Sequence, residues 1–229
     1  MKEQEDKDVW SYGGYWDNPG RKGQKPDIKL HEIVPKMVGP SSNREKCLDL
    51  GSAEGGFALV LKKLGYDVCA TDIDERSLKI LRDRGFNPVK VDVNEAFPFE
   101  DGEFNLVTCL EVIEHIKTPD NMLKEITRVL KPGGSLIIST PNINWWYLRI
   151  KHLFGKWDMH DPDHIRFYTP TRLKRIMQEY GFKVVEVKSY FVSPHINLHN
   201  IKIPPERLRT FEQHIFHNIS YGFILRCHK

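Results

Sequence analysis

The residues best suited to chemistry surround a glycine-rich turn in the first third of the chain. An apolar run leads into Asp49-Leu50-Gly51-Ser52-Ala53-Glu54-Gly55 and then into a helical pattern, which predicts a strand, a tight turn and a helix. Glycines in such a turn let a ligand approach the backbone closely. Asp49 and Glu54 place carboxylates in or beside the turn, where they would repel a pyrophosphate. The same carboxylates would attract an ammonium or sulfonium group, so the turn favours a cationic amino-acid nucleoside.

Acidic residues also follow the next two predicted strands. Asp72 lies about 20 residues beyond the first glycine, where a carboxylate can accept hydrogen bonds from ribose hydroxyls. Asp92 ends the third apolar run, where it and the following backbone can meet an adenine edge. We therefore expect a nucleoside site at the carboxyl ends of these strands. The residues expected to contact the ligand are Asp49, Gly51, Ser52, Ala53, Gly55, Asp72, Ile73, Asp92, Val93 and Leu110.

A second group of reactive side chains follows the fourth predicted strand. The segment 111–115, Glu-Val-Ile-Glu-His, would bring two carboxylates and an imidazole to one face if it turns helically, and the segment 160–164 offers further imidazoles and carboxylates. Such a set can act as a general base or hold Mg, Mn, Fe or Zn, and we favour a role without a metal. The expected catalytic residues, which are also the candidate ligands of a divalent metal, are Glu111, Glu114, His115 and His164.

Short apolar runs alternate with helical patterns along most of the chain, which predicts an α/β fold with a parallel sheet and crossover helices. Strands are expected at 47–50, 67–70, 88–91, 104–110, 135–139, 183–187 and 220–226, and helices at 31–38, 57–64, 75–84, 121–130 and 170–180. Thr118 and Thr169, each followed by proline, are expected to cap helix starts, and Gly85, Gly133 and Gly181 to mark helix ends.

In these motifs the chain resembles the class I S-adenosylmethionine-dependent methyltransferases, over roughly 47–181 and again at the closing strand. The resemblance implies a doubly wound, Rossmann-like sheet of seven strands, mostly parallel with the last strand antiparallel, and S-adenosylmethionine as cofactor. It makes 49–55 the acidic glycine loop, Asp72 the ribose acid, Asp92 the residue beside the adenine, and 131–134 the turn before the fifth strand. Ala53 replaces the family's middle glycine, which is tolerable unless φ must be positive there.

The Glu-x-x-Glu-His block is similar to that of ubiquinone-pathway O-methyltransferases and of small-RNA 3′-end 2′-O-methyltransferases, in which it helps hold a divalent metal. In the RNA enzymes a later Asp-His segment assists, as Asp163-His164 would here. With the resemblance, we expect a methyltransferase whose acceptor is a hydroxyl of a small molecule, apolar or aromatic in character. The long segment 141–168 is rich in aromatic residues and is the expected substrate-facing insertion.

Other functions remain open on the sequence alone. Methylation of an RNA 2′-hydroxyl would need a contiguous basic face, and a non-catalytic module would bind S-adenosylmethionine without turnover. An NAD-dependent reductase is disfavoured by the two carboxylates at the glycine turn. The residues that could begin a basic face for RNA are Arg149, Lys151, Lys156 and Arg166.

Length and composition predict one domain over 1–229, because 229 residues with 40% apolar side chains can bury one sizeable core. We expect residues 1–40 to form an N-terminal arm and helix, and 190–218 to be a second substrate-side insertion beside 141–168. The net charge of +3, with acids and bases interspersed, does not by itself indicate nucleic acid. The four cysteines form no CxxC pair, and no apolar run resembles a signal or a membrane span, so we expect a cytoplasmic protein; the oligomeric state stays open.

Overall fold

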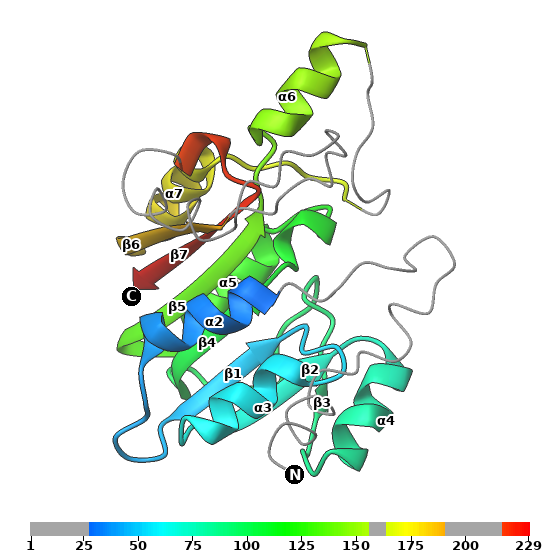
Figure 1. Ribbon diagram of the computed structural model, residues 1–229. Coiled ribbons are helices and arrows are strands. Elements are labelled where there is room, and N and C mark those ends of the chain that lie inside the picture. The colour runs from blue at the N-terminus through cyan, green and yellow to red at the C-terminus, as the bar shows by residue number, and fades with distance from the viewer. Residues whose placement is uncertain (1–27, 156–163, 191–216) are drawn as a thin grey trace.

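A seven-stranded sheet forms the centre of the computed structural model, which describes residues 28–155, 164–190 and 217–229 (Figure 1). The strand order is β3-β2-β1-β4-β5-β7-β6; β1 to β5 pair in parallel, and β7 runs antiparallel to both β5 and β6. The strands are β1 (Lys46–Leu50), β2 (Asp67–Asp72), β3 (Val89–Lys90), β4 (Phe104–Leu110), β5 (Leu130–Pro141), β6 (Lys183–Tyr190) and β7 (Gly222–His228). The predicted mostly parallel sheet with an antiparallel last strand is confirmed.

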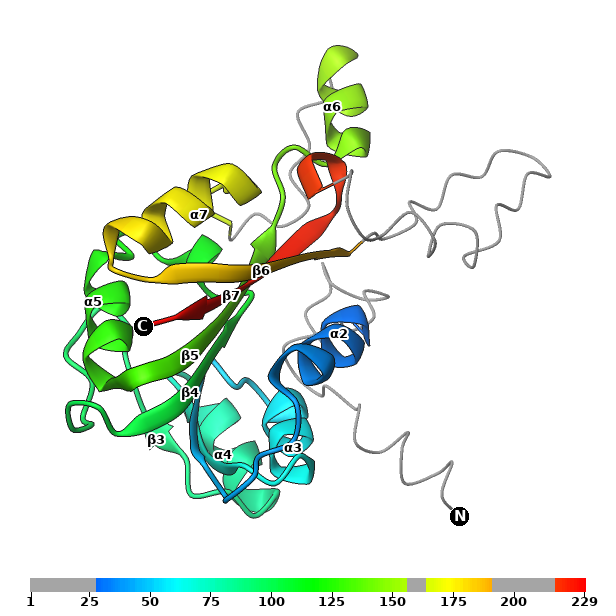
Figure 2. The ribbon, with the colours of Figure 1, turned by 90° about the vertical axis from the view of Figure 1, so that its left-hand side faces the viewer.

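Helices cover both faces of this sheet, as the side view in Figure 2 shows, with α2 and α3 on one face and α5 and α7 on the other. The α-helices are α2 (Ile28–Val38), α3 (Gly56–Lys63), α4 (Glu75–Asp83), α5 (Asp120–Val129), α6 (Trp146–Leu153) and α7 (Pro170–Glu179), and the short 3-10 helices are η2 (Ile113–His115) and η3 (His217–Ile219).

The central strands are apolar on both sides because each side is buried under helices. In β4, Leu106 belongs to the cluster packed with α2 and α3, while its neighbour Val107 belongs to the cluster packed with α5 and α7. β5 alternates in the same way, with Ile137 on the first side and Ile138 on the second. This double burial explains the near-continuous apolar runs from which the strands were predicted.

The order of the strands fixes where a ligand can bind. From β1 the chain continues to β2 and β3 on one side and then crosses to β4 on the other, so the order reverses between β1 and β4. In open α/β sheets ligands bind at such a switch point, outside the carboxyl ends of the strands. The glycine turn after β1, Asp72 at the end of β2 and Glu111 after β4 all lie at this edge.

Most predicted helix boundaries are confirmed, and two are wrong. Thr169 accepts a hydrogen bond from the Arg172 N–H at 3.1 Å and caps α7 as expected. Thr118 does not cap α5, because the cap residue is Pro119 and no side chain makes a capping hydrogen bond there. Gly133 does not end α5 either: the chain turns extended at Leu130, directly after the helix, and the turn containing Gly133 lies within β5.

The predicted insertion 141–168 contains the helix α6. α6 buries only Leu148, so it lacks the apolar stripe by which amphipathic helices are recognised. Figures 1 and 2 show α6 projecting beyond the end of the sheet. Within that segment, 156–163 lie outside the described residues, as do 1–27 of the predicted N-terminal arm and 191–216 of the second insertion.

The four cysteines lie in strands, one each in β1, β2, β4 and β7, and all four are free. Three are buried and Cys69 is half-buried, in keeping with a role as small apolar core residues. Within the described ranges, no helix has the length and apolar character that crossing a membrane requires. The expected single domain and cytoplasmic location stay predictions.

Gly222 is expected to be essential to the packing of β6 against β7. It pairs with Tyr190, and a Cβ atom at Gly222 would lie 2.2 Å from the Tyr190 hydroxyl oxygen. Because Tyr190 is fully buried, Gly222→Ala should lower the free energy of unfolding by about 1–3 kcal/mol, measured by urea denaturation. In a Tyr190→Leu background the same substitution should be much less harmful. An equal loss in both backgrounds would refute this steric explanation.

Candidate active site

Hydrogen bonds join the glycine turn after β1 to the neighbouring strand β2. The Ser52 N–H donates to the Thr71 carbonyl at 2.8 Å, and the Ser52 hydroxyl accepts from the Thr71 N–H at 3.1 Å and donates to the Asp49 carbonyl at 2.9 Å. The Ala53 N–H donates to Asp72 Oδ2 at 2.8 Å. The turn is therefore braced by protein groups, and the Ser52 hydroxyl, expected to contact the ligand, serves this brace.

The backbone of the turn is left-handed at Ala53, which changes how the replacement of glycine must be judged. Gly51 has φ of +68°, and Ala53 has φ of +47°. An L-residue with a Cβ atom is strained in this region, so the condition under which alanine was expected to be harmless is not met. At Gly51 glycine is also required by space, because a Cβ atom there would lie 2.6 Å from Val112 Cγ2.

Asp49 holds a buried carboxylate at the carboxyl end of β1. Its Oδ1 accepts a hydrogen bond from the Thr108 hydroxyl at 2.6 Å, whereas Oδ2 is buried and has no hydrogen-bond partner among the described residues. Burial is the main cause that raises the pKa of Asp49 to about 6; the hydrogen bond from Thr108 opposes the shift, and the nearby Asp72 carboxylate adds to it. An unsatisfied buried carboxylate oxygen fits a ligand with a positively charged donor, such as the ammonium of an amino acid.

The other predicted nucleoside contacts lie along the same edge of the sheet. Asp72 ends β2, with Oδ1 accepting from the Asp74 N–H at 2.9 Å in addition to the bond from the turn. Asp92 follows β3 and accepts from the Asn94 backbone and side-chain amides at 2.9 and 2.8 Å. Each carboxylate oxygen can accept more than one hydrogen bond, so both remain competent acceptors for a ligand. Ile73 is 54% exposed beside them.

The second predicted group comes together in space, although His164 lies 49 residues after His115 in the sequence. Ligand atoms of Glu114, His115 and His164 all lie within 4.8 Å of one another. The two imidazole rings meet edge to face with centroids 4.8 Å apart, and His164 Nε2 lies 4.0 Å from Glu114 Oε1. Glu114 is buried, and its Oε2 accepts a hydrogen bond from the Thr140 hydroxyl at 3.1 Å. Asp163, which the sequence analysis paired with His164, lies outside the described residues.

Glu111 is turned away from this cluster. It has φ of +55°, so the chain bends sharply between β4 and η2. Its Oε1 accepts hydrogen bonds from the Ser139 hydroxyl at 2.6 Å and from the Tyr190 hydroxyl at 3.2 Å. The expected common face therefore holds Glu114 and His115 but not Glu111, and a catalytic role for Glu111 stays a prediction.

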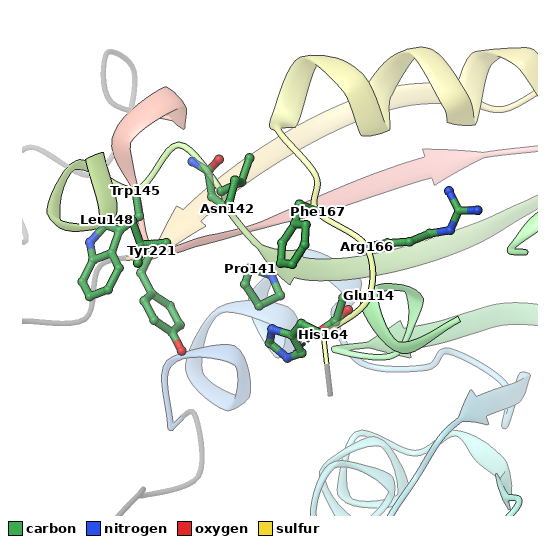
Figure 3. Close-up of a pocket in the computed structure, with 10 residues that line it drawn as sticks. Glu114, Pro141, Asn142, Trp145, Leu148, His164, Arg166, Phe167 and Tyr221 are labelled. Atoms are coloured by element: carbon green, nitrogen blue, oxygen red, sulfur yellow. Dashed lines mark ion pairs between the residues drawn. The ribbon is translucent and has the colours of Figure 1, made fainter. Parts of the chain in front are cut away.

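An open, largely apolar pocket adjoins the cluster. Figure 3 shows Glu114 and His164 together at one end of it, with the rings of Trp145 and Tyr221 and that of Phe167 around the remaining space. Trp145 and Tyr221 are in edge-to-face contact, with centroids 5.0 Å apart. The full lining is Glu114, Pro141, Asn142, Ile143, Trp145, Leu148, His164, Arg166, Phe167 and Tyr221. The sequence drew attention to the aromatic segment that includes Trp145, but nothing in it indicated that Tyr221 would join this wall.

The fold and the site define a class I S-adenosylmethionine-dependent methyltransferase. A doubly wound sheet with an antiparallel β7, an acidic glycine turn after β1 and an acid at the end of β2 are found together. The chain belongs to the methyltransferase domain family, whose model matches residues 25–187. Membership in this family favours an enzyme over the non-catalytic module and over the NAD-dependent reductase, and identifies S-adenosylmethionine as the cofactor.

Curated relatives and solved structures agree with this assignment. The chain is 28% identical over 197 residues to a ubiquinone biosynthesis O-methyltransferase of Idiomarina loihiensis, covering 79% of each chain. It is also 28% identical to the protein of the same name from Thiobacillus denitrificans, covering 76% of this chain and 82% of that one. A SAM-dependent methyltransferase of Archaeoglobus fulgidus has the same fold, with a TM-score of 0.63, 22% identity, and coverage of 88% of this chain and 92% of that one.

We expect the buried charge of Asp49 to lower the stability of the protein without ligand. Its pKa is about 6, against an ordinary value of 3.8, so the folded state binds the extra proton and stability falls as pH rises from 3.8 to 6. Asp49→Asn should therefore raise the free energy of unfolding at pH 8 by about 3 kcal/mol, with almost no gain at pH 3.5. Denaturant unfolding at the two pH values measures this, and equal stabilities at pH 8 would contradict it.

Ala53→Gly should make the protein more stable. Relief of the left-handed strain gains about 1–2 kcal/mol, and the greater freedom of glycine in the unfolded chain removes part of that, leaving about 0.5–1 kcal/mol. Thermal and urea unfolding measure the change. Ala58→Gly in α3 is the matched control, since Ala58 is helical and buried, and the same substitution there should lower stability. A loss at both positions would show that Ala53 is not strained.

Proposed function

We propose that this enzyme methylates a hydroxyl group of a small molecule that binds in the pocket beside Glu114 and His164. The observation that carries the proposal is that one pocket joins apolar and aromatic walls to a buried carboxylate and an imidazole. Aromatic walls suit an apolar or aromatic acceptor, and the polar end suits the one group of that acceptor that must lose a proton.

S-adenosylmethionine supplies a methyl group on a sulfonium centre, and the protein has to hold the acceptor in line with it. Asp49 attracts the ammonium group through its unsatisfied Oδ2, and Asp72 accepts from the ribose hydroxyls. Glu114 and His164 then lie at the acceptor side. Alignment and removal of the acceptor's proton are the two tasks left to this chain.

The cluster of Glu114, His115 and His164 can remove that proton in two ways. His164 can act as the general base, with the Glu114 carboxylate 4.0 Å away to stabilise the imidazolium that forms. The same three side chains, two imidazoles and one carboxylate, also fit a divalent transition metal, which would lower the pKa of a hydroxyl. We favour the base without a metal. Full activity after chelation would support it, and loss of activity restored by Mn or Zn would support the metal.

An oxygen acceptor is supported by the relatives, both of which are named as O-methyltransferases of ubiquinone biosynthesis. An RNA acceptor has less support. Arg166, one of the residues suggested for a basic face, directs its guanidinium to the Lys117 carbonyl, and the Lys151 ammonium lies 5.6 Å from the centre of the Tyr147 ring. Arg149 is exposed, and Lys156 lies outside the described residues.

Glu114→Gln and His164→Ala should each lower kcat by about 10²–10⁴-fold, because the first removes the carboxylate that stabilises the imidazolium and the second removes the base itself. The affinity for S-adenosylmethionine, measured by calorimetry, should stay within about twofold, because neither residue lies at the glycine turn. Asp72→Ala serves as the contrasting variant: it should weaken cofactor binding by about 1–3 kcal/mol, because the hydrogen bonds from the ribose hydroxyls are lost.

The assay uses mass spectrometry to follow methyl transfer to a panel of hydroxylated aromatic molecules, with an aromatic amine and a short RNA as competitors. Transfer to oxygen in the small molecules is the expected result. Methylation of the RNA or of the amine alone would overturn the proposal. Unchanged kcat in both Glu114→Gln and His164→Ala would leave the pocket in place but remove the proposed base.

A further inference from the structure

The segment that carries His164 is attached to η2 by its backbone. The N–H groups of Ile165 and Arg166 both donate to the Glu114 carbonyl, at 3.1 and 3.0 Å. The chain is therefore fixed directly beside the residue that His164 faces. A second attachment follows at Tyr168, whose carbonyl accepts from the Ile143 N–H at 3.1 Å.

The Arg166 side chain adds a separate attachment to the chain just after η2. Its Nε donates to the Lys117 carbonyl at 2.8 Å, and its Nη2 donates to the same oxygen. Figure 3 shows Arg166 extending away from His164 and Glu114. The guanidinium thus does not point at the reacting end of the pocket, although Arg166 is among the residues that line it.

We propose that Arg166 is a positioning residue that holds His164 against Glu114 and His115. The backbone bonds hold the segment at the Glu114 carbonyl and at Tyr168. The side-chain bond from Arg166 to the Lys117 carbonyl, three residues beyond Glu114, adds a third attachment and so sets the direction in which the chain passes the cluster. His164 comes from a part of the sequence distant from the other two residues, so its place depends on these attachments.

A lysine cannot reproduce this arrangement fully. The planar guanidinium presents two N–H groups in a fixed fork to one oxygen, whereas an ammonium on a flexible stem presents a single rotating point charge. Arg166→Lys should therefore retain part of the effect and Arg166→Gln very little. The inference rests on the proposed function, which makes Glu114, His115 and His164 the catalytic cluster, but its test does not require turnover.

Zn²⁺ serves as the probe of geometry. Two imidazoles and a carboxylate bind Zn²⁺ only when all three reach about 2.0–2.2 Å from one ion, so its affinity reports whether the cluster is assembled. Calorimetric titration of the full chain, with the signal of His164→Ala subtracted, isolates this site from other histidines. We expect Arg166→Gln to weaken the His164-dependent binding by about 10–100-fold and Arg166→Lys to lie between it and the unmodified protein.

Arg175→Gln is the matched control, because Arg175 is 82% exposed on α7 and its guanidinium Nε pairs with Glu179 on the same helix. Its Zn²⁺ affinity should equal that of the unmodified protein. S-adenosylmethionine affinity and Tm of the two Arg166 variants should be nearly unchanged, which separates a displaced His164 from a misfolded chain.

Two results would overturn the inference. Either Arg166→Gln and Arg166→Lys bind Zn²⁺ within about twofold of the unmodified protein, or that protein shows no His164-dependent binding at all. If Arg166→Gln does not fold, Arg166→Lys alone decides the matter by the same criterion. A failure of the proposed function looks different: the Zn²⁺ affinities would follow the expected order while no small-molecule hydroxyl is methylated.

Discussion

In the proposed function, the carboxylate of Asp49 is the charge on which binding of the cofactor depends. It lies inside the sheet, and its only hydrogen-bonded oxygen within the described chain is the one that faces Thr108. Its pKa is raised to about 6 because burying the charged carboxylate away from water costs free energy. A cationic ligand removes that penalty and an anionic one increases it. This sign separates a methyltransferase loop from the phosphate-binding glycine turns that it otherwise resembles.

Sheet topology brings the two halves of the proposed reaction to one edge. The switch in strand order lies between β1, which carries Asp49, and β4, and the sharp bend at Glu111 turns the chain directly from β4 into η2, which carries Glu114. His164 arrives from beyond α6 and is fixed to η2 through the Glu114 carbonyl. In the proposed reaction, cofactor binding thus depends on strand ends, whereas acceptor chemistry depends on a later segment attached to them.

The sequence predicted the strand ends well because their pattern is local: Asp72 follows an apolar run at a spacing that the topology dictates. It could not predict conformations set by distant contacts. The left-handed backbone at Ala53 arises where the turn is bonded to β2, and Glu111 is drawn to Ser139 and Tyr190 rather than to its sequence neighbours. The positions of these groups depend on residues 19 to 79 apart along the chain.

The most direct test of the account is the proton balance of S-adenosylmethionine binding at pH 5.5, measured by calorimetry in two buffers of different ionisation enthalpy. If the ligand's ammonium meets the Asp49 carboxylate, whose pKa is about 6 in the free protein, binding should release roughly three-quarters of a proton at this pH and almost none at pH 8. Asp49→Asn should abolish the release. Proton release that is absent at pH 5.5, or that persists in Asp49→Asn, would contradict the central claim.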